Sequence, residues 1–327
     1  MAPNHSPGTS NLLKYHRPKL RLKEAKIPTL SQESKQCLRN LVAYRPPKAR
    51  LPVPPTSRRA AVLVALFVGR MGDLYVLLSR RSATLRTYAG DTSLPGGRMD
   101  EGDVNVEDTA RREAFEEIGL PRDRRKVPLL CLFEPFLAGN DLIVTPVVVL
   151  ILDNTLRPML NAAEVTSLFS HPLVSFLSSV SPFTSEPESV EVKYHTHVDH
   201  SSTGPNNAAW TIRMHRFLTG REAGGIKPVF GLTAAMLIRV ATVGYARTPD
   251  FEVQLAGSPS LEQRIAWALY SRPTFRQAFE HHRIQVDWPL VKKIAGIRED
   301  SIERQAKYDH SPGKGIWSLW RHERSKL

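Results

Sequence analysis

The chain has 327 residues, of which 41% are hydrophobic and 24% are charged, a composition typical of globular proteins that bury a sizeable core. Its net charge of +13 is uneven, because residues 1–60 contain 13 Lys or Arg residues and two Glu residues and so carry +11 of it. Cys37 and Cys131 form no Cys-x-x-Cys motif, which argues against a disulfide framework or a cysteine zinc site. The apolar runs 60–69 and 142–152 are about half of the ~20 residues that a membrane helix needs. They predict buried strands and no membrane span.

The composition divides the chain into three parts. Residues 1–55 are rich in Pro, Lys and Arg, and we expect a partly disordered basic leader with one short helix near residues 31–44. Residues 56–246 alternate strand-like and helical patterns and are expected to form the main domain. Residues 247–327 predict a helical C-terminal extension. A basic surface attracts nucleic acid, but this charge lies outside the main domain, so we expect a flexible arm and no nucleic-acid partner.

Within the main domain the expected elements follow in chain order. Two strands, at 60–68 and 74–80, precede a turn-rich stretch, and a helix then runs from about Glu107 to Ile118 and ends at Gly119. Further strands are expected at 127–133, 142–152, 190–198 and 210–219, with loops at 178–189 and 199–208 and an apolar helix at 231–246. His195 and His197 alternate on one expected strand, and we expect both to face solvent rather than a metal.

The helix expected after Glu107 carries three carboxylates on one arc. At 100° per residue, Glu113, Glu116 and Glu117 share a side and apolar residues occupy the other. Arg112 lies one turn before Glu116 and can pair with it, whereas its neighbour on the apolar side, Arg111, is expected to reach out to solvent. Like charges on one turn repel. The helix is therefore either an ordinary solvated surface helix or the holder of a hard cation such as Mg²⁺.

Residues 96–120 read GGRMDEGDVNVEDTARREAFEEIGL and resemble the Nudix box. The matching residues are Gly97, Arg112, Glu113, Ala114, Glu116, Glu117, Gly119 and Leu120. Asp103 stands where the pattern has its first Glu, and eight residues rather than seven separate it from Arg112. The coenzyme A diphosphatase branch of the Nudix hydrolases tends to carry the same two departures.

A second stretch, LLSRRSATLRTYAGDTSLPGG (77–97), resembles the upstream signature of that branch, with Ser79 in place of Thr. The aligned residues are Arg81, Ser82, Leu85, Arg86, Gly90, Pro95, Gly96 and Gly97. FGLTAAML (230–237) resembles the closing helix of the family. The resemblance covers residues 56–246.

The resemblance implies a Nudix α/β/α sandwich with a mixed β-sheet. It also implies an enzyme that hydrolyses the pyrophosphate bond of coenzyme A and its derivatives to 3′,5′-ADP and 4′-phosphopantetheine or acyl-phosphopantetheine. On this reading Mg²⁺ or Mn²⁺ is held by Glu113, Glu116, Glu117 and the carbonyl of Gly97. Arg112 orients Glu116, and the general base is Glu116, Glu117 or an acid from a later loop. The residues expected to bind substrate are Arg81, Ser82, Arg86 and Gly96.

Two other functions fit the same residues. One is a Nudix hydrolase for another nucleoside diphosphate derivative, such as ADP-ribose, NADH or an RNA cap, with the basic leader recruiting RNA. The other is a Nudix-fold binding module without catalysis. The three glutamates with Arg112 argue against the second, because a module without catalysis gains nothing from like charges held together.

The sequence ends in Ser325-Lys326-Leu327, which matches the peroxisomal address read by an import receptor. We therefore expect a peroxisomal protein with that receptor as a partner. The basic leader could instead act as a mitochondrial transit peptide, but it is rich in Pro and Lys and shows no amphipathic period.

Overall fold

The structure is a computed structural model of the chain. It describes residues 20, 22, 25, 27–85, 88–153, 155–183, 193–222 and 225–298, and for 220–222 and 225–227 it describes only the backbone. Arg86, most of the basic leader and Ser325-Lys326-Leu327 lie outside these ranges.

The main domain is built on one mixed sheet. Five of its strands are ordered β3-β2-β1-β7-β5, while β4 pairs with β1, β6 with β7 and β8 with β2. β1 and β7 run parallel, and the other pairs are antiparallel. The strands are β1 Arg59–Val68, β2 Leu74–Arg81, β3 Thr92–Ser93, β4 Gly96–Arg98, β5 Leu129–Leu132, β6 Phe136–Leu137, β7 Ile143–Leu150 and β8 Val165–Pro172. The strands expected at 60–68, 74–80, 127–133 and 142–152 are all present.

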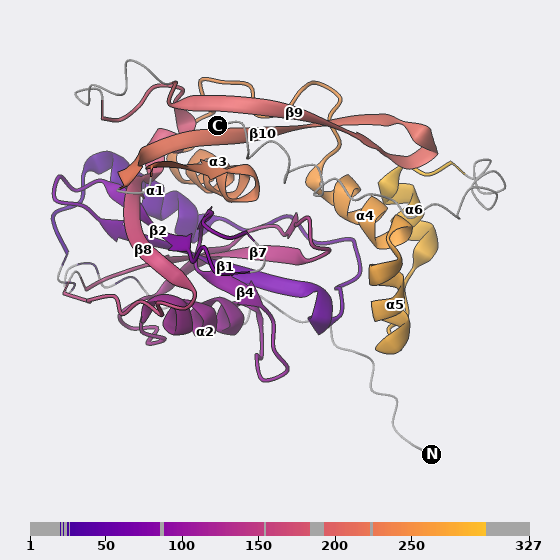
Figure 1. Ribbon diagram of the computed structural model, residues 1–327, viewed down its shortest axis with the longest axis horizontal. Helices are drawn as coiled ribbons and strands as arrows, with labels where there is room; N and C mark the ends of the chain where they lie inside the picture. Colours follow the sequence, from indigo (N-terminus) through magenta and orange to yellow (C-terminus); the bar gives the residue numbers. More distant parts are fainter. Residues whose placement is uncertain are drawn as a thin grey trace.

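Helices cover both faces of this sheet (Figure 1). Alternate residues of β1 enter two different cores: Leu63 packs with the residues of α2 (Val106–Ile118), and Val64 packs with those of α1 (Gln32–Ala43) and α3 (Gly231–Tyr245). Because β1 is buried on both faces, it reads as a continuous apolar run. The expected α/β/α sandwich with a mixed sheet is confirmed, and so is the short helix expected near residues 31–44.

A second, three-stranded antiparallel sheet lies over α3 (Figure 1). Its strands are β9 His195–Thr203, β10 Ala209–Glu222 and β11 Gly225–Phe230, in the order β11-β10-β9. The loop expected over 199–208 was wrong in its first half. β9 continues to Thr203 because its pairing with β10 extends to Ala209, and such pairing is invisible in the local pattern.

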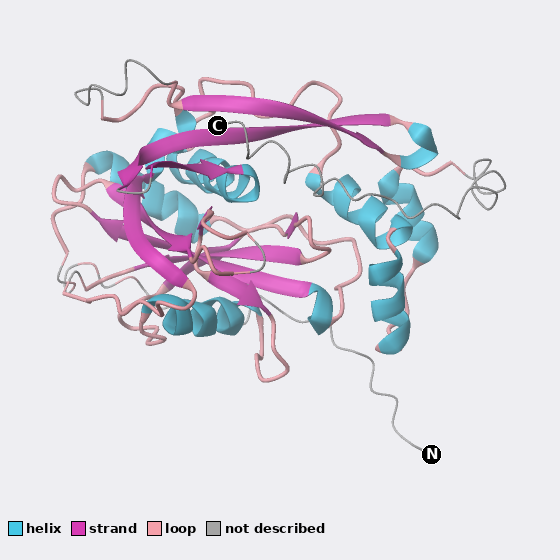
Figure 2. Ribbon diagram, viewed as in Figure 1, coloured by secondary structure: helices cyan, strands magenta, loops and turns pink. Residues whose placement is uncertain are grey.

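The described part of the C-terminal extension, residues 247–298, is helical, as expected (Figure 2). Its helices are α4 Leu261–Ser271, α5 Pro273–His281 and α6 Trp288–Ala295, and the 3₁₀ turns of the chain include η2 Thr56–Arg58, η3 Leu173–Leu177 and η5 Pro205–Asn207. The three helices share a core to which Ile143 of β7 belongs. Asp141, just before β7, pairs with Arg272 and accepts a hydrogen bond from Thr274 Oγ1 at 2.8 Å. The division at 55 and 246 stays a prediction.

None of the helices in the described ranges combines the length and the apolar character needed to cross a bilayer.

Candidate active site

The helix that carries the three glutamates, α2, is set by local signals at both ends. At its start, Asn105 Oδ1 accepts hydrogen bonds from the backbone N–H groups of Glu107 at 2.9 Å and Asp108 at 3.1 Å. At its end, Gly119 adopts a left-handed conformation with φ 69°. Both ends agree with the sequence, which placed the helix from about Glu107 to Ile118.

Two of the carboxylates face Gly96 and Gly97, the first residues of strand β4. The backbone N–H of Gly96 donates to Glu117 Oε2 at 3.1 Å. A Cβ on Gly97 would lie 2.5 Å from Glu113 Oε1, so another residue here would push this carboxylate aside. Ala110, Ala114 and Ile118 pack against the sheet and thereby turn the carboxylate face of the helix toward β4.

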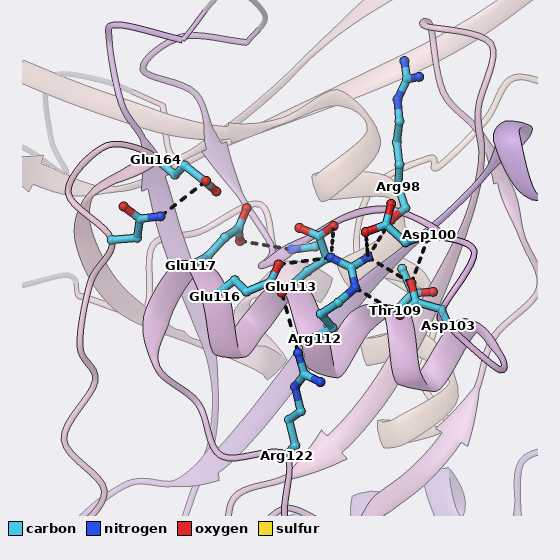
Figure 3. A network of polar contacts seen from close by, with 12 residues as sticks. Arg98, Asp100, Asp103, Thr109, Arg112, Glu113, Glu116, Glu117, Arg122 and Glu164 are labelled. Atoms are coloured by element: carbon cyan, nitrogen blue, oxygen red, sulfur yellow. Dashed lines mark hydrogen bonds and ion pairs between the residues drawn. The ribbon is translucent and has the colours of Figure 1, made fainter.

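Arg112 is the centre of a dense network (Figure 3). Its Nη1 donates to Glu113 Oε1 and Glu116 Oε2, each at 3.0 Å, which confirms the predicted pairing with Glu116. On the other side its Nε and Nη2 donate to the two oxygens of Asp103 at 3.0 and 2.9 Å, and Nη2 also donates to the carbonyl of Arg98 at 2.9 Å. The Asp103 bonds were not expected. They suggest a role for Asp103 at the position where the Nudix box has Glu, because the Asp103 carboxylate binds the Arg112 guanidinium in a bidentate geometry.

The pKa values of the acids divide the site into a neutralised part and a part short of positive charge. Burial alone would raise the pKa of Asp103, but hydrogen bonds from Arg112, Asp100 and Thr109 hold it below its ordinary value. By contrast, burial raises the pKa of Glu117 to about 7, against which the Gly96 N–H and Arg81 act only in part. Burial also raises the pKa of Glu113. At the Glu113–Glu117 end, the positive charges of Arg112 and Arg81 offset the effect of burial only in part.

The donor set at that end fits a hard divalent cation in its chemistry. Buried carboxylate oxygens short of positive charge are the ligands that Mg²⁺ and Mn²⁺ prefer, and the Gly97 backbone lies against one of them. In the described part of the chain, however, no three His, Cys, Asp or Glu side chains are already grouped as metal ligands. Glu113 and Glu116 instead both turn toward Arg112.

The upstream signature contributes Arg81, which the sequence assigned to substrate binding. Arg81 Nη1 lies 3.8 Å from Glu117 Oε1, and the side chain is 24% exposed. Its Nε is buried and has no hydrogen-bond partner among the described residues. The side chain thus lies beside the buried carboxylate of Glu117 and is partly exposed.

Ser82 lies beside Arg81 but is occupied by structural contacts. It is buried, its Oγ is 2.8 Å from Thr84 Oγ1, and its N–H donates to the carbonyl of Glu164 at 2.7 Å. Ser82 thereby joins the signature loop to the loop before β8. Arg86, the other arginine assigned to substrate, lies outside the described residues.

Sequence reasoning did not single out Glu164. It lies just before β8, its Oε1 accepts a hydrogen bond from Asn161 Nδ2 at 3.3 Å, and its charge helps to raise the pKa of both Glu113 and Glu117. No local signal marks it, because it approaches the site through the pairing of β8 with β2 and the backbone bond from Asn161 N–H to the carbonyl of Glu117.

The expectation that Arg111 reaches solvent was wrong. The side chain is 4% exposed, its Nε donates to Glu107 Oε1 at 2.7 Å and its Nη2 donates to the carbonyl of Val127 at 2.8 Å. Arg124 also donates to Glu107 Oε1, at 3.0 Å. A helical wheel marks the position as apolar but does not show that a carboxylate is buried beside it.

The expectation for His195 holds only in part, because its ring is half-buried rather than freely facing solvent. Its Nε2 lies 2.9 Å from Nδ1 of His215, and it stacks on Phe251 with the ring centres 3.9 Å apart. Burial lowers its pKa to about 4. His197, opposite His215 in the sheet, is exposed as expected. The cluster lies in the second sheet and not beside the carboxylates of α2.

Comparison with known proteins places this site in a family. The NUDIX domain family matches residues 57–153, a range that contains β1, β4 and all of α2. The peroxisomal coenzyme A diphosphatase NUDT7 of Mus musculus is 30% identical over 216 residues, which cover 65% of this chain and 82% of that protein. The chain belongs to the Nudix family.

Two further relatives share part of the Nudix chain. Nudix hydrolase 15, mitochondrial, of Arabidopsis thaliana is 39% identical over 195 residues, or 59% of this chain and 61% of that protein. Peroxisomal coenzyme A diphosphatase 1 of Saccharomyces cerevisiae is 36% identical over 181 residues, or 47% of this chain and 53% of that protein. The chain thus matches between one half and two thirds of the length of these two relatives.

Proposed function

We propose that this Nudix protein hydrolyses the pyrophosphate bond of coenzyme A and its derivatives, releasing 3′,5′-ADP and 4′-phosphopantetheine or an acyl-phosphopantetheine. One observation carries the proposal: the buried Glu117 accepts from the Gly96 N–H and has Arg81 at 3.8 Å. It brings the upstream signature and the Nudix box into one site. The names of two of the relatives, both coenzyme A diphosphatases, support the substrate.

The proposed metal ligands are the carboxylates of Glu113, Glu116 and Glu117 and the carbonyl of Gly97. A bound Mg²⁺ or Mn²⁺ supplies positive charge to the diphosphate oxygens and lowers the pKa of coordinated water. The raised pKa of Glu117 supports this assignment, because the site lacks the charge that a cation supplies.

The residues around the ligands position them. Arg112 donates a hydrogen bond to Glu116, and Asp103 accepts two hydrogen bonds from Arg112. Asp103 therefore keeps the guanidinium of Arg112 in place even when the Glu116 carboxylate changes its orientation. Arg81, whose side chain is 24% exposed, is a proposed ligand of a phosphate oxygen. Arg86 remains a proposed phosphate ligand on the resemblance alone.

For the proton acceptor we propose Glu116, Glu117 or Glu164. The sequence suggested an unidentified acid from a later loop as one candidate. We propose Glu164 for this acid, since its charge acts on both Glu113 and Glu117. Glu164→Gln should lower kcat more than KM. A Glu164→Gln variant with the wild-type pH profile would remove it from the three.

The substrate is tested by comparing purified protein on coenzyme A, dephospho-coenzyme A, ADP-ribose, NADH and capped RNA with Mg²⁺, followed by product identification. If a guanidinium holds the 3′-phosphate, dephospho-coenzyme A should react about ten- to a hundredfold more slowly in kcat/KM, the typical loss for one charge-assisted contact. Faster cleavage of ADP-ribose than of coenzyme A would instead favour the other nucleotide reading.

Variants then locate the contact. Arg81→Ala and Arg86→Ala should each lower activity on coenzyme A more than on dephospho-coenzyme A. The ratio is the readout, since Arg81 also touches Glu117. Arg70→Ala, an exposed arginine in the turn after β1, is the matched control and should leave the ratio unchanged.

We also propose that the protein acts in peroxisomes and is imported through Ser325-Lys326-Leu327. Two relatives bear the word peroxisomal in their names, while a third is named mitochondrial, so the compartment needs its own test. Removing the tripeptide should leave hydrolysis unchanged and move a fluorescent fusion to the cytosol. A fusion that stays in peroxisomes, or that lies in mitochondria throughout, would contradict the assignment.

A further inference from the structure

A pocket with a volume of about 310 Å³ lies between α2, the loop that precedes it and the loop that follows it. Its lining residues are Gly102, Asp103, Asp108, Arg111, Arg122 and Arg124. Arg81, Glu113 and Glu117 do not line it. The pocket is therefore distinct from the place proposed above for the metal and the diphosphate.

The carboxylates that line the pocket already have hydrogen-bond donors on every oxygen. Asp103 accepts from Arg112 on both of its oxygens, and this pairing also neutralises its charge. Asp108 Oδ1 accepts from Arg124 Nη2 at 3.1 Å, and its Oδ2 accepts from Asn105 Nδ2 at 3.0 Å. A ligand that enters the pocket therefore finds these acceptors engaged.

The most buried arginine of the pocket, by contrast, has a donor left over. Arg111 is 4% exposed, and its Nε and Nη2 donate to Glu107 and to the carbonyl of Val127. Its Nη1 is buried as well and has no hydrogen-bond partner among the described residues. A buried donor without an acceptor is costly, and native proteins contain few of them. Because Arg111 lines a pocket, the missing acceptor can enter from outside.

The pocket also has one positive charge in excess. Arg111 and Arg124 are balanced by two carboxylates, since Arg111 pairs with Glu107 and Arg124 pairs with Glu107 and Asp108. Arg122 is the third arginine of the lining and has no counterpart among these acids. The lining as a whole therefore favours a ligand with negative charge.

Arg122 is held only weakly by its ion pair outside the pocket. Its side chain is 52% exposed, and its Nη2 lies 3.6 Å from Glu116 Oε1, which is too far for a hydrogen bond. Glu116 has a closer partner in Arg112, which donates to its Oε2 at 3.0 Å. The guanidinium of Arg122 can therefore turn to a ligand in the pocket without leaving Glu116 unpaired.

A donor without an acceptor, carboxylates that are already engaged and an excess positive charge together match a small oxyanion. We propose that this pocket binds a tetrahedral oxyanion such as inorganic phosphate, held by Arg111 and Arg122. A water molecule would satisfy the Arg111 donor but would leave the charge of Arg122 unused. The proposal does not depend on the function proposed above.

Calorimetric titration of the purified protein with inorganic phosphate, in EDTA and at constant ionic strength, tests the pocket. Wild-type protein should bind phosphate, and Arg122→Gln should weaken this binding about tenfold or more, because one charge-assisted contact is lost. Arg111→Met should weaken it to a similar extent. Since Arg111→Met also removes a buried ion pair, circular dichroism checks its folding, and the exposed Arg122 position carries the test if that variant does not fold.

Arg125→Gln is the matched control, because Arg125 is exposed in the same loop and does not line the pocket. Arg81→Gln removes the guanidinium of the proposed active site instead. Both variants should keep the phosphate binding that Arg122→Gln weakens. If only Arg81→Gln loses binding, phosphate occupies the proposed active site and the pocket is overturned. Absence of binding in wild-type protein, or equal affinity in all four variants, would overturn it as well, and none of these results depends on hydrolysis.

Discussion

Arg111 and Arg112 are neighbours in α2, yet their guanidinium groups do different work. Arg111 is 4% exposed and pairs with Glu107, which is equally buried, on the side of the helix that faces the protein. Arg112 is 15% exposed and pairs with Glu116, which is 47% exposed, and with Glu113 on the other side. Arg111 and Arg112 point about 100° apart around the helix axis. This rotation places the Arg111 ion pair inside the protein and the Arg112 ion pairs at the proposed active site.

The difference lies in what surrounds each pair. Around Arg111 the charges balance, since Arg111 and Arg124 meet two carboxylates, Glu107 and Asp108, and the Val127 carbonyl accepts a further hydrogen bond from Arg111. On the opposite face Arg112 cannot balance every carboxylate, and the pKa of Glu117 rises to about 7. A shortage of positive charge, rather than the number of ion pairs, distinguishes the proposed site.

The largest expected effect on this comparison comes from Glu117→Gln. We expect kcat to fall about a hundredfold or more, because the change removes a proposed metal ligand or base. The fold should remain intact, because the amide can still accept from the Gly96 N–H. Steady-state kinetics beside Glu101→Gln, the same change at an exposed acid of the preceding loop, measures this. Near-wild-type turnover by Glu117→Gln would remove the residue from the site.

The next effect falls on the buried pair. Arg111→Met should lower the free energy of unfolding by about 2 kcal/mol, less than the usual cost of breaking a buried pair, because Arg124 still neutralises Glu107. The kcat/KM per folded molecule should not change. Denaturant unfolding and kinetics on the same samples measure both quantities. A loss of activity without a loss of stability would show that Arg111, like Arg112, supports the proposed active site, and would contradict the distinction between the two arginines.

A smaller effect is expected from Arg112→Lys. Lysine keeps the charge but cannot bond Asp103 in a bidentate geometry and reach Glu116 at the same time, so turnover should fall about tenfold. The melting temperature should change little. Titration of Mg²⁺ against activity separates lost metal affinity from lost turnover. Wild-type kinetics in this variant would show that only the charge of Arg112 matters.

The smallest effect is on the pH dependence of stability without metal. The folded-state pKa of Glu117, about 7, lies above its ordinary value of 4.5, so the folded protein favours the protonated acid. Stability from this group is therefore present below about pH 4.5 and is lost as the pH rises toward 7. In EDTA, Glu117→Gln should match wild type at pH 5 and melt higher at pH 8. Equal melting temperatures at pH 8 would contradict the shortage of positive charge.

The sequence by itself determined α2 and the face it presents. Its boundaries, the common arc of Glu113, Glu116 and Glu117, and the bond from Arg112 to Glu116 all follow from the helical period and from glycine at the C-cap. The strands of the central sheet were also readable, since runs buried on both faces are continuously apolar. These features depend on residues within a few positions of one another.

Only the tertiary structure decided which charges meet. Asp103 reaches Arg112 across the loop before α2, and Glu164 reaches Glu117 through the pairing of β8 with β2. Burial of Arg111 depends on the carbonyl of Val127, and the contact of His195 depends on Phe251 beyond α3. Local periodicity predicts which face of an element a residue occupies. It does not predict which residue that face will contact, because the contacting residue comes from a distant segment whose position depends on the folded chain.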